Sequence, residues 1–192
     1  MAEEPERATV LVVDDEEEVA DVYALTLEQA YDTRTAYGGE AAIEALDGTV
    51  DVVLLDRRMP DISGDEILEE IRARELDCRV IMITAVDPDF DIIDMPFDDY
   101  LCKPVEGDDL TTAVEQQLAA RTYDARLSEY LELVSKLALL ESEKTSQELE
   151  SSEEVARLRE RTQTLKAEMD AALEEFEDIE LAFREIGRRP GR

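Results

Sequence analysis

Residues 51–64 read DVVLLDRRMPDISG, and this stretch decides the fold. The aliphatic run from Val52 to Leu55 leaves no polar face, so the strand it predicts should be covered on both sides, as in a parallel sheet. Asp56 then stands at the carboxyl end of that strand, where open α/β sheets bind ligands. The alternative is a helix N-cap, but the next helix is expected to start several residues later, near Gly64. Asp56 is therefore a candidate site residue.

Strands and helices are expected to alternate around this stretch, which is typical of a doubly wound parallel sheet. The expected strands cover residues 9–13, 33–37, 52–56, 79–85 and 99–102, and the expected helices cover residues 16–29, 40–46 and 64–74. Between Thr84 and Lys103 the pattern weakens, and prolines leave room only for a short or irregular helix. From about Gly107 the chain is expected to be helical with few breaks.

The C-terminal region has the spacing of a coiled coil. Its seam runs in steps of three and four through Val155, Leu158, Thr162, Leu165, Met169, Ala172, Phe176, Ile179, Phe183 and Ile186. The preceding helix offers a matching stripe at Leu127, Tyr130, Val134, Leu137 and Leu140. We expect a capping box of Ser151 and Glu154 at the start of the second helix, and Gly187 at its end. The pattern predicts an antiparallel hairpin within the chain, with a parallel homodimeric coil of residues 155–186 as the competing arrangement.

The composition excludes several kinds of protein. The chain has 51 acidic and 20 basic residues and a net charge of −31, so its surface should resist non-specific binding to nucleic acid and to anionic membranes. Residues 1–121 hold 33 of the acidic and 9 of the basic residues, which concentrates the acidity in the N-terminal two thirds. Acid-rich, lysine-poor usage is typical of proteins that work in molar salt; the alternative is an acidic protein from ordinary salt.

The chain has no histidine, which excludes histidine-dependent catalysis, most zinc sites and a phosphohistidine on this chain. Cys78 and Cys102 lack CxxC spacing and are expected to be buried free thiols in a reducing compartment. No apolar stretch is long enough for a membrane span, and the acidic N-terminus is unlike a signal peptide. We therefore expect a cytoplasmic protein that has no membrane partner.

Three carboxylates are expected at one edge of the sheet, because Asp14 and Asp15 follow the first strand and Asp56 ends the third. Two like charges about 4 Å apart cost on the order of 4 kcal/mol at an effective dielectric constant of about 20, so the cluster should bind a cation. Oxygen ligands without histidine or cysteine favour Mg²⁺. Thr84 and Lys103 add a hydroxyl and an ammonium at two further strand ends, where they could hold a phosphoryl group. Each residue alone has an ordinary structural explanation; their combination indicates a site.

Residues 8–121 resemble the receiver domain of two-component response regulators. The resemblance rests on Asp14-Asp15, on DRRMPDISG at residues 56–64, on Thr84-Ala85 and on DYLCKP at residues 99–104. It implies an α/β fold of the flavodoxin-like type, a doubly wound five-stranded parallel sheet with strand order 2-1-3-4-5. It also implies that Asp56 accepts a phosphoryl group from a sensor histidine kinase in a Mg²⁺-dependent reaction.

The resemblance implies the metal ligands as well. Asp15 and Asp56 would bind Mg²⁺ directly together with the backbone carbonyl of Arg58, and Asp14 would act largely through water. An Asp56 oxygen would attack the phosphorus of the kinase's phosphohistidine, and no general base is needed because the carboxylate is already deprotonated. A phosphatase of the haloacid dehalogenase type would need a second aspartate two residues after Asp56, where this chain has Arg58.

The remaining site residues would respond to the phosphoryl group. By the same resemblance, Lys103 would pair with one phosphoryl oxygen, Thr84 would move to hydrogen-bond another, and Tyr100 would then turn inward. The Lys103–Pro104 peptide bond would be cis. The chain would be a phosphoacceptor and not an enzyme, with at most slow auto-dephosphorylation.

Two features depart from the usual receiver pattern. The segment between Thr84 and Lys103 is a few residues short, so dimerisation through the fourth helix and fifth strand is not carried over. The output region lacks a helix-turn-helix or winged-helix pattern. Residues 84–93, the acidic composition and the C-terminal helices instead resemble the HalX-type receiver proteins of haloarchaea. We expect a disordered acidic N-terminus (1–7), a receiver domain (8–121), a helical coiled-coil output domain (122–187) and a basic tail (188–192).

Three functions of the output region remain open. It could dimerise or bind a partner helix when Asp56 is phosphorylated, it could bind DNA as a transcriptional regulator, or the protein could be a phosphate sink with a passive tail. DNA binding would rest on Arg157, Arg159, Arg161, Lys166 and the basic tail. Residues 122–192 hold 18 acidic and 11 basic residues, and this negative balance favours the interaction role.

Overall fold

The computed structural model describes residues 7–85 and 90–185, with side chains as far as residue 173. The chain divides into two compact units, the first made mainly by Met1–Leu118 and the second by Ala119–Ala182. Several expectations lie outside the described residues or side chains: those for residues 1–6, 86–89 and 188–192, for Phe176, Ile179, Phe183 and Ile186 in the seam, and for Gly187.

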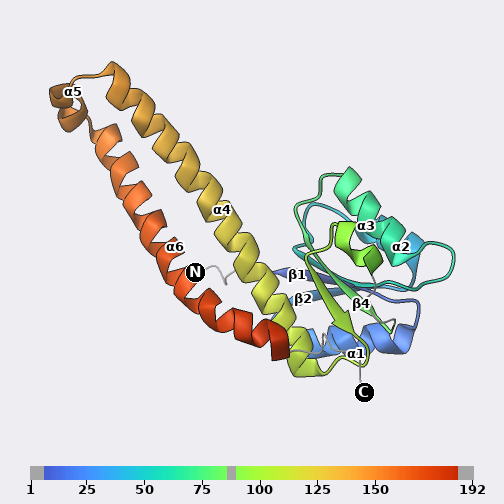
Figure 1. The fold of residues 1–192 in the computed structure, drawn as a ribbon. Coiled ribbons are helices and arrows are strands. Elements are labelled where there is room, and N and C mark those ends of the chain that lie inside the picture. Colours follow the sequence, from blue (N-terminus) through green and yellow to red (C-terminus); the bar gives the residue numbers. More distant parts are fainter. Residues whose placement is uncertain (1–6, 86–89, 186–192) are drawn as a thin grey trace, which may run out of the picture. The chain divides into compact units, whose positions relative to one another are not determined.

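The first unit is a five-stranded sheet with helices on both faces (Figure 1). Its strands are β1 (Thr9–Val13), β2 (Asp32–Ala36), β3 (Val52–Asp56), β4 (Arg79–Thr84) and β5 (Asp99–Cys102). Its helices are α1 (Glu17–Leu27), α2 (Gly39–Ala45), α3 (Gly64–Ala73), the 3-10 helix η1 (Phe90–Asp94) and the start of α4 (Gly107–Glu143). All neighbouring strands are parallel, and the strand order β2-β1-β3-β4-β5 confirms the predicted topology.

The central strand β3 is buried along its whole length, which explains its unbroken aliphatic run. Val53 and Leu55 pack into a core shared with α2 and α3 on one face. Val52 and Leu54 pack on the other face with α1 and the start of α4. The period of two along a strand therefore supplies both layers of the sandwich from consecutive residues.

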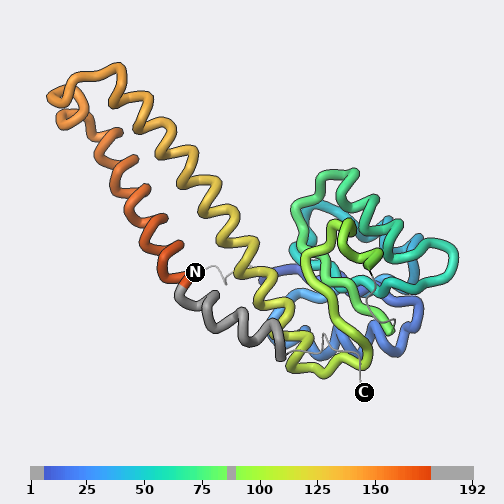
Figure 2. Tube along the Cα trace, in the orientation of Figure 1, coloured from blue at the N-terminus to red at the C-terminus, as the bar shows by residue number. Residues whose placement is uncertain are grey.

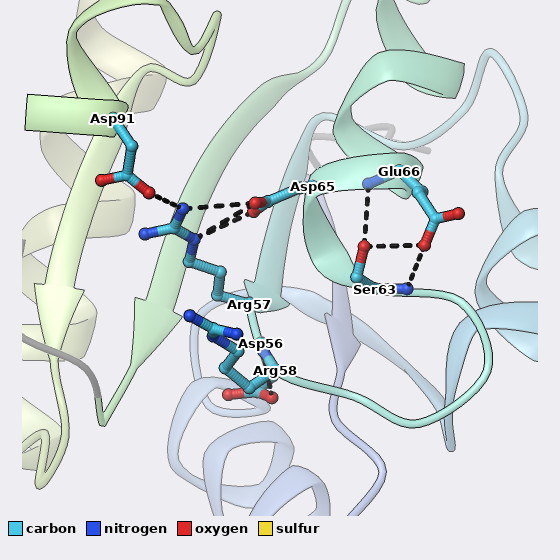
Figure 3. Close-up of polar contacts among 7 residues, drawn as sticks. All are labelled: Asp56, Arg57, Arg58, Ser63, Asp65, Glu66 and Asp91. Carbon is cyan, nitrogen blue, oxygen red and sulfur yellow. Dashed lines mark hydrogen bonds and ion pairs between the residues drawn. The ribbon is translucent and has the colours of Figure 1, made fainter.

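The loop after β3 is fixed to the start of α3. Ser63 is the N-cap of α3, and its hydroxyl accepts a hydrogen bond from the Glu66 N–H while the Glu66 carboxylate accepts one from the Ser63 N–H at 2.9 Å (Figure 3). Ser63 thus fills the capping role considered for Asp56, and Asp56 is free for other chemistry. Gly64 donates its N–H to the Arg57 carbonyl at 3.1 Å, which brings the helix start against the end of the strand.

A short helix replaces the usual fourth helix of such a sheet. The 3-10 helix η1 confirms the expectation of a short or irregular helix for the described part of this segment. Ile92, Met95 and Phe97 pack against the core on the α3 face. Phe90 and Ile93 point outward and are 85% and 72% exposed.

The second unit is a helical hairpin, formed by the later part of α4, a short helix α5 (Ser146–Ser151) and α6 (Glu153–Glu185) (Figure 2). Three ion pairs join the two long helices in antiparallel register: Arg126–Glu168, Arg161–Glu129 and Arg159–Glu141. The antiparallel arrangement within one chain therefore confirms the predicted hairpin.

The seam of α6 is confirmed as far as its side chains are described. Val155, Leu165 and Met169 are buried. The seam residues Leu158 and Thr162, which lie between Val155 and Leu165, are half-buried. The stripe on α4 needs one correction, because Val134 is 37% exposed and Leu133 is half-buried in its place. The other residues of the predicted stripe, Leu127, Tyr130, Leu137 and Leu140, are half-buried.

The predicted capping box at the start of α6 was wrong. Ser151 belongs to α5 and donates its hydroxyl to the Glu148 carbonyl, whereas the hydroxyl of Ser152 accepts the Val155 N–H at 3.2 Å. A capping box instead opens α5, with Thr145 as N-cap. The polar stretch between the two long helices contains the short helix α5, and this shifts the start of the second long helix by one residue.

Cys78 and Cys102 are buried and form no disulfide, as expected. Within the described residues, no helix combines the length and apolar character that a membrane span requires.

The close approach of Gly64 to the end of β3 predicts a specific loss of stability in Gly64→Ala. A Cβ atom at this position would lie 2.2 Å from the Asp56 carbonyl oxygen. Because alanine is the better helix former, any decrease in the free energy of unfolding would come from this clash. We expect the decrease to be about 1–3 kcal/mol. Chemical denaturation measures the effect. Gly48→Ala is the control, because nothing lies within 4 Å of its added Cβ and it should be neutral; equal stability of the two variants would contradict the prediction.

Candidate functional site

The three carboxylates singled out from the sequence meet at the carboxyl edge of the sheet. Asp14 and Asp15 follow β1, Asp56 ends β3, and these two strands are neighbours. One oxygen from each carboxylate lies within 4.8 Å of the others. Asp14 and Asp56 are buried, whereas Asp15 is exposed. The cluster therefore has one side open to solvent.

The Lys103 ammonium bridges the two buried carboxylates. Its Nζ donates to Asp14 Oδ2 at 2.7 Å and lies 2.9 Å from Asp56 Oδ1. The remaining oxygens accept backbone hydrogen bonds, Asp14 Oδ1 from the Glu16 N–H and Asp56 Oδ2 from the Arg58 N–H. Fixed donors therefore hold both carboxylates with their charges facing the cluster.

The surroundings shift the pKa values of this group. Burial raises the pKa of Asp56, and Asp14 adds to the rise, while Lys103 lowers it. Burial alone would lower the pKa of Lys103, but its hydrogen bonds to Asp14 and Asp56 outweigh burial and raise that pKa. Three carboxylates around one ammonium leave an excess of negative charge. The all-oxygen donor set fits a hard divalent cation such as Mg²⁺.

The other expected residues lie at the neighbouring strand ends. Thr84 ends β4 and is fully buried, and its carbonyl accepts the Lys103 N–H at 2.7 Å. The Lys103–Pro104 peptide bond is cis, as expected. Tyr100 on β5 is buried, and its ring lies 5.6 Å from that of Phe97. The backbone carbonyl of Arg58 as a metal ligand stays a prediction.

Sequence reasoning missed two residues near the site. Arg57 is only 5% exposed, and its guanidinium binds Asp65 and Asp91 (Figure 3). Strand alternation offered a signal, since residues 53, 55 and 57 share the face that α3 covers. Tyr23 on α1 is half-buried, and its pKa is raised by burial and by the nearby Asp14 and Asp56 carboxylates, while Lys103 lowers it.

The family of response regulator receiver domains matches residues 10–115 of this chain. The chain belongs to this family. The HalX domain matches residues 119–186, which include most of the helical hairpin. The receiver fold, with its flavodoxin-like sheet, and the HalX-type C-terminal region thus both agree with the resemblance noted in the sequence.

Related proteins differ from this one in length. A Haloferax volcanii protein named as a transcriptional regulator is 49% identical over 165 residues, which are 85% of this chain and 28% of that protein. The transcriptional regulatory protein DltR of Streptococcus agalactiae is 32% identical over 154 residues, 78% of this chain and 66% of DltR. This chain thus spans only part of the length of these relatives.

Solved receiver structures share the fold of the first unit. The receiver domain of the Francisella response regulator 1452 is 30% identical with a TM-score of 0.53, and covers 58% of this chain and 96% of its own. The Thermotoga maritima response regulator TrrA, solved in complex with Mg²⁺ and beryllofluoride, is 32% identical with a TM-score of 0.50, and covers 58% of this chain and 99% of its own.

The raised pKa of Asp56 predicts that Asp56→Asn stabilises the receiver when a chelator is present. In the unfolded chain Asp56 ionises near its ordinary pKa of 3.8, at a lower pH than in the folded chain. As the pH rises from there through the folded pKa, the folded state therefore loses stability, and the loss persists at neutral pH. An amide avoids this loss and still offers Lys103 an oxygen acceptor.

Melting temperatures of the wild type and Asp56→Asn between about pH 4 and pH 7 measure the effect. The advantage of the variant should grow with pH and reach a few degrees. Asp61→Asn makes the same charge change at an exposed position of the same loop, with a backbone φ of 64° that asparagine tolerates, and should show no such trend. An Asp56→Asn protein that melts below the wild type at pH 7 would refute the argument.

Proposed function

We propose that this chain is a two-component response regulator whose Asp56 accepts a phosphoryl group from a sensor histidine kinase. The observation that supports it best is the contact of the Lys103 ammonium with both Asp14 and Asp56, within 3 Å of each, beside the exposed Asp15. A buried nucleophilic carboxylate, a cation for the phosphoryl oxygens and an open acidic edge are the parts that phosphoryl transfer needs.

The same residues would hold a metal ion. Asp14, Asp15 and Asp56 form an all-oxygen cluster that suits Mg²⁺, and the Arg58 carbonyl would complete the set of ligands. When bound, Mg²⁺ would offset negative charge on the transferred phosphoryl oxygens. The Thermotoga maritima TrrA complex with Mg²⁺ and beryllofluoride supports this assignment by similarity.

The reaction is an in-line displacement at phosphorus. An Asp56 oxygen forms the new O–P bond while the N–P bond to the kinase's histidine breaks, and the electron pair of that bond stays on the imidazole nitrogen. Lys103 would transfer its contact from Asp56 Oδ1 to a phosphoryl oxygen, and the Thr84 hydroxyl would hydrogen-bond another. Tyr100, which was expected to turn inward, is already buried, and the phosphoryl group would stabilise it there. The chain is then a phosphoacceptor, and slow hydrolysis of the aspartyl phosphate would reset it.

Phosphoryl labelling tests this function directly. A phosphohistidine donor should label the wild type only when Mg²⁺ is present, and Asp56→Asn should not be labelled, because the nucleophilic oxygen is lost. Asp15→Ala should fold normally and take up much less label, since one charged ligand is missing. Asp61→Asn should label like the wild type, because Asp61 is exposed and outside the cluster. Acid-stable label, or label retained by Asp56→Asn, would exclude Asp56 as the acceptor.

The phosphorylation state would control the helical hairpin as an interaction module. Leu131 and Leu139 are 55% and 65% exposed on α4, which leaves apolar surface after the hairpin has closed. The relatives named as transcriptional regulators favour a second candidate, DNA binding through the same helices. Against it, the charges of Arg159 and Arg161 are already paired with Glu141 and Glu129. A passive phosphate sink is the third possibility.

Light scattering in high salt separates these three candidates. With Mg²⁺ and beryllofluoride, the interaction role predicts a rise from the 21.7 kDa monomer to about twice that mass, and Leu139→Ala should weaken the association, because it removes exposed apolar surface. The mass of Asp56→Asn should not rise under the same conditions. A shift that appears only with added DNA fragments would favour the transcriptional role, and no shift under either condition would favour the sink.

A further inference from the structure

Arg57 is a permanent cation that is buried next to the phosphoacceptor position. Its Nε donates to Asp65 Oδ1 at 3.0 Å and its Nη2 to Asp65 Oδ2 at 3.2 Å (Figure 3). The Nη2 atom also donates to Asp91 on η1, and the guanidinium hydrogen-bonds the Tyr100 side chain. One side chain thus connects the end of β3 with α3, η1 and β5.

The two carboxylate partners are held differently. Asp65 lies in the first turn of α3, which Ser63 and Glu66 cap firmly. Asp91 lies on the five-residue η1, and its side chain is 53% exposed. A buried guanidinium needs at least one ionic partner, and Asp65 meets that need by itself. Asp91 is therefore the partner that can leave.

The far end of the same segment is fixed independently. Asp98 is held by Arg72 at 2.7 Å and by Arg79 at 2.9 Å, and Arg72 also donates to the Pro96 carbonyl at 2.9 Å. Loss of the Arg57–Asp91 contact would therefore loosen η1, which would keep its apolar contact through Ile92, and leave the start of β5 in place.

Building on the proposed function, we propose that the Arg57–Asp91 ion pair is a latch that couples the position of η1 to phosphorylation of Asp56 through Tyr100. The backbone of Arg57 is fixed on both sides, because its N–H donates to the Ile83 carbonyl at 3.0 Å and its carbonyl accepts from Gly64. Only its side-chain contacts can change.

The direction of the coupling follows from these contacts. A buried Tyr100 places its hydroxyl on the guanidinium, and this contact helps to hold Arg57 where Asp91 meets it. An inward Tyr100 and a latched η1 therefore stabilise each other. A phosphoryl group that favours the inward Tyr100 also favours the closed latch, and by reciprocity a closed latch strengthens phosphoryl binding. The latch also sets the position of the exposed Phe90 and Ile93.

Two measurements on Asp91→Asn test the latch, with Asp94→Asn as the matched control. Asp94 lies on the same helix, its substitution makes the same charge change, and it has no ion pair among the described residues. In the unphosphorylated protein, hydrogen exchange of amides 90–95 should be severalfold faster in Asp91→Asn than in Asp94→Asn. The affinity for beryllofluoride with Mg²⁺ should fall at least about fivefold in Asp91→Asn, the lower end of ordinary allosteric couplings. Asp91→Glu, which keeps the carboxylate, should recover most of this affinity.

The outcomes separate the latch from the proposed function. Equal exchange in the two asparagine variants would overturn the latch, whatever the protein binds. Equal beryllofluoride affinity, with exchange still faster in Asp91→Asn, would overturn its coupling to Asp56. A wild type that binds no beryllofluoride would overturn the proposed function and the coupling together, and the exchange comparison would still decide whether Asp91 holds η1.

Discussion

The repulsion between two buried carboxylates, relieved by one ammonium, is the constraint that orders the receiver unit. Asp14 and Asp56 come together only because β1 and β3 are neighbours, and Lys103 must reach them from the end of β5. Two like charges this close cost on the order of 4 kcal/mol at an effective dielectric constant of about 20, a large fraction of the stability of a small domain. With Asp15 added, one ammonium cannot balance three carboxylates. The fold therefore maintains a site that gains stability from any further positive charge, and this is the electrostatic basis of cation binding there.

The end of β3 also places a second buried charge, that of Arg57, on the opposite face of the sheet. Successive residues of a strand point to opposite sides, so Asp56 turns toward Lys103 while Arg57 turns toward α3. One face thus buries a carboxylate that needs a cation, and the other buries a cation that needs carboxylates. The two networks share the backbone of β3, and Gly64 allows α3 to approach it closely. A change of charge at Asp56 on one face therefore occurs at the residue next to Arg57, which serves the other face.

The sequence predicted the features that depend on local pattern or on the edge of a parallel sheet. The aliphatic run of β3 required two covering layers, and the strand-end positions of Asp14, Asp56 and Lys103 required proximity once the topology was known. The sequence could not predict contacts between side chains that are distant along the chain. The pairing of Arg57 with Asp91, for example, depends on how η1 packs on the α3 face of the sheet. The sequence also could not fix the start of α6 to a single residue. Ser151 and Ser152 are equally good N-caps, and only the end of α5 decides between them.

Salt should affect the electrostatic contacts of the two units unequally. The interhelical pairs of the hairpin, such as Arg161–Glu129, have both partners nearly half exposed, and screening over about 3 Å in molar salt would remove most of their small contribution. The cohesion of the hairpin must then rest on the apolar seam through Val155, Leu165 and Met169. Lys103 instead lies between the buried carboxylates of Asp14 and Asp56, where salt screens charges much less. At high salt, the ionic contacts that retain most of their strength are therefore those of the phosphoacceptor site, whereas the Arg57–Asp91 latch has one exposed partner and is screened more.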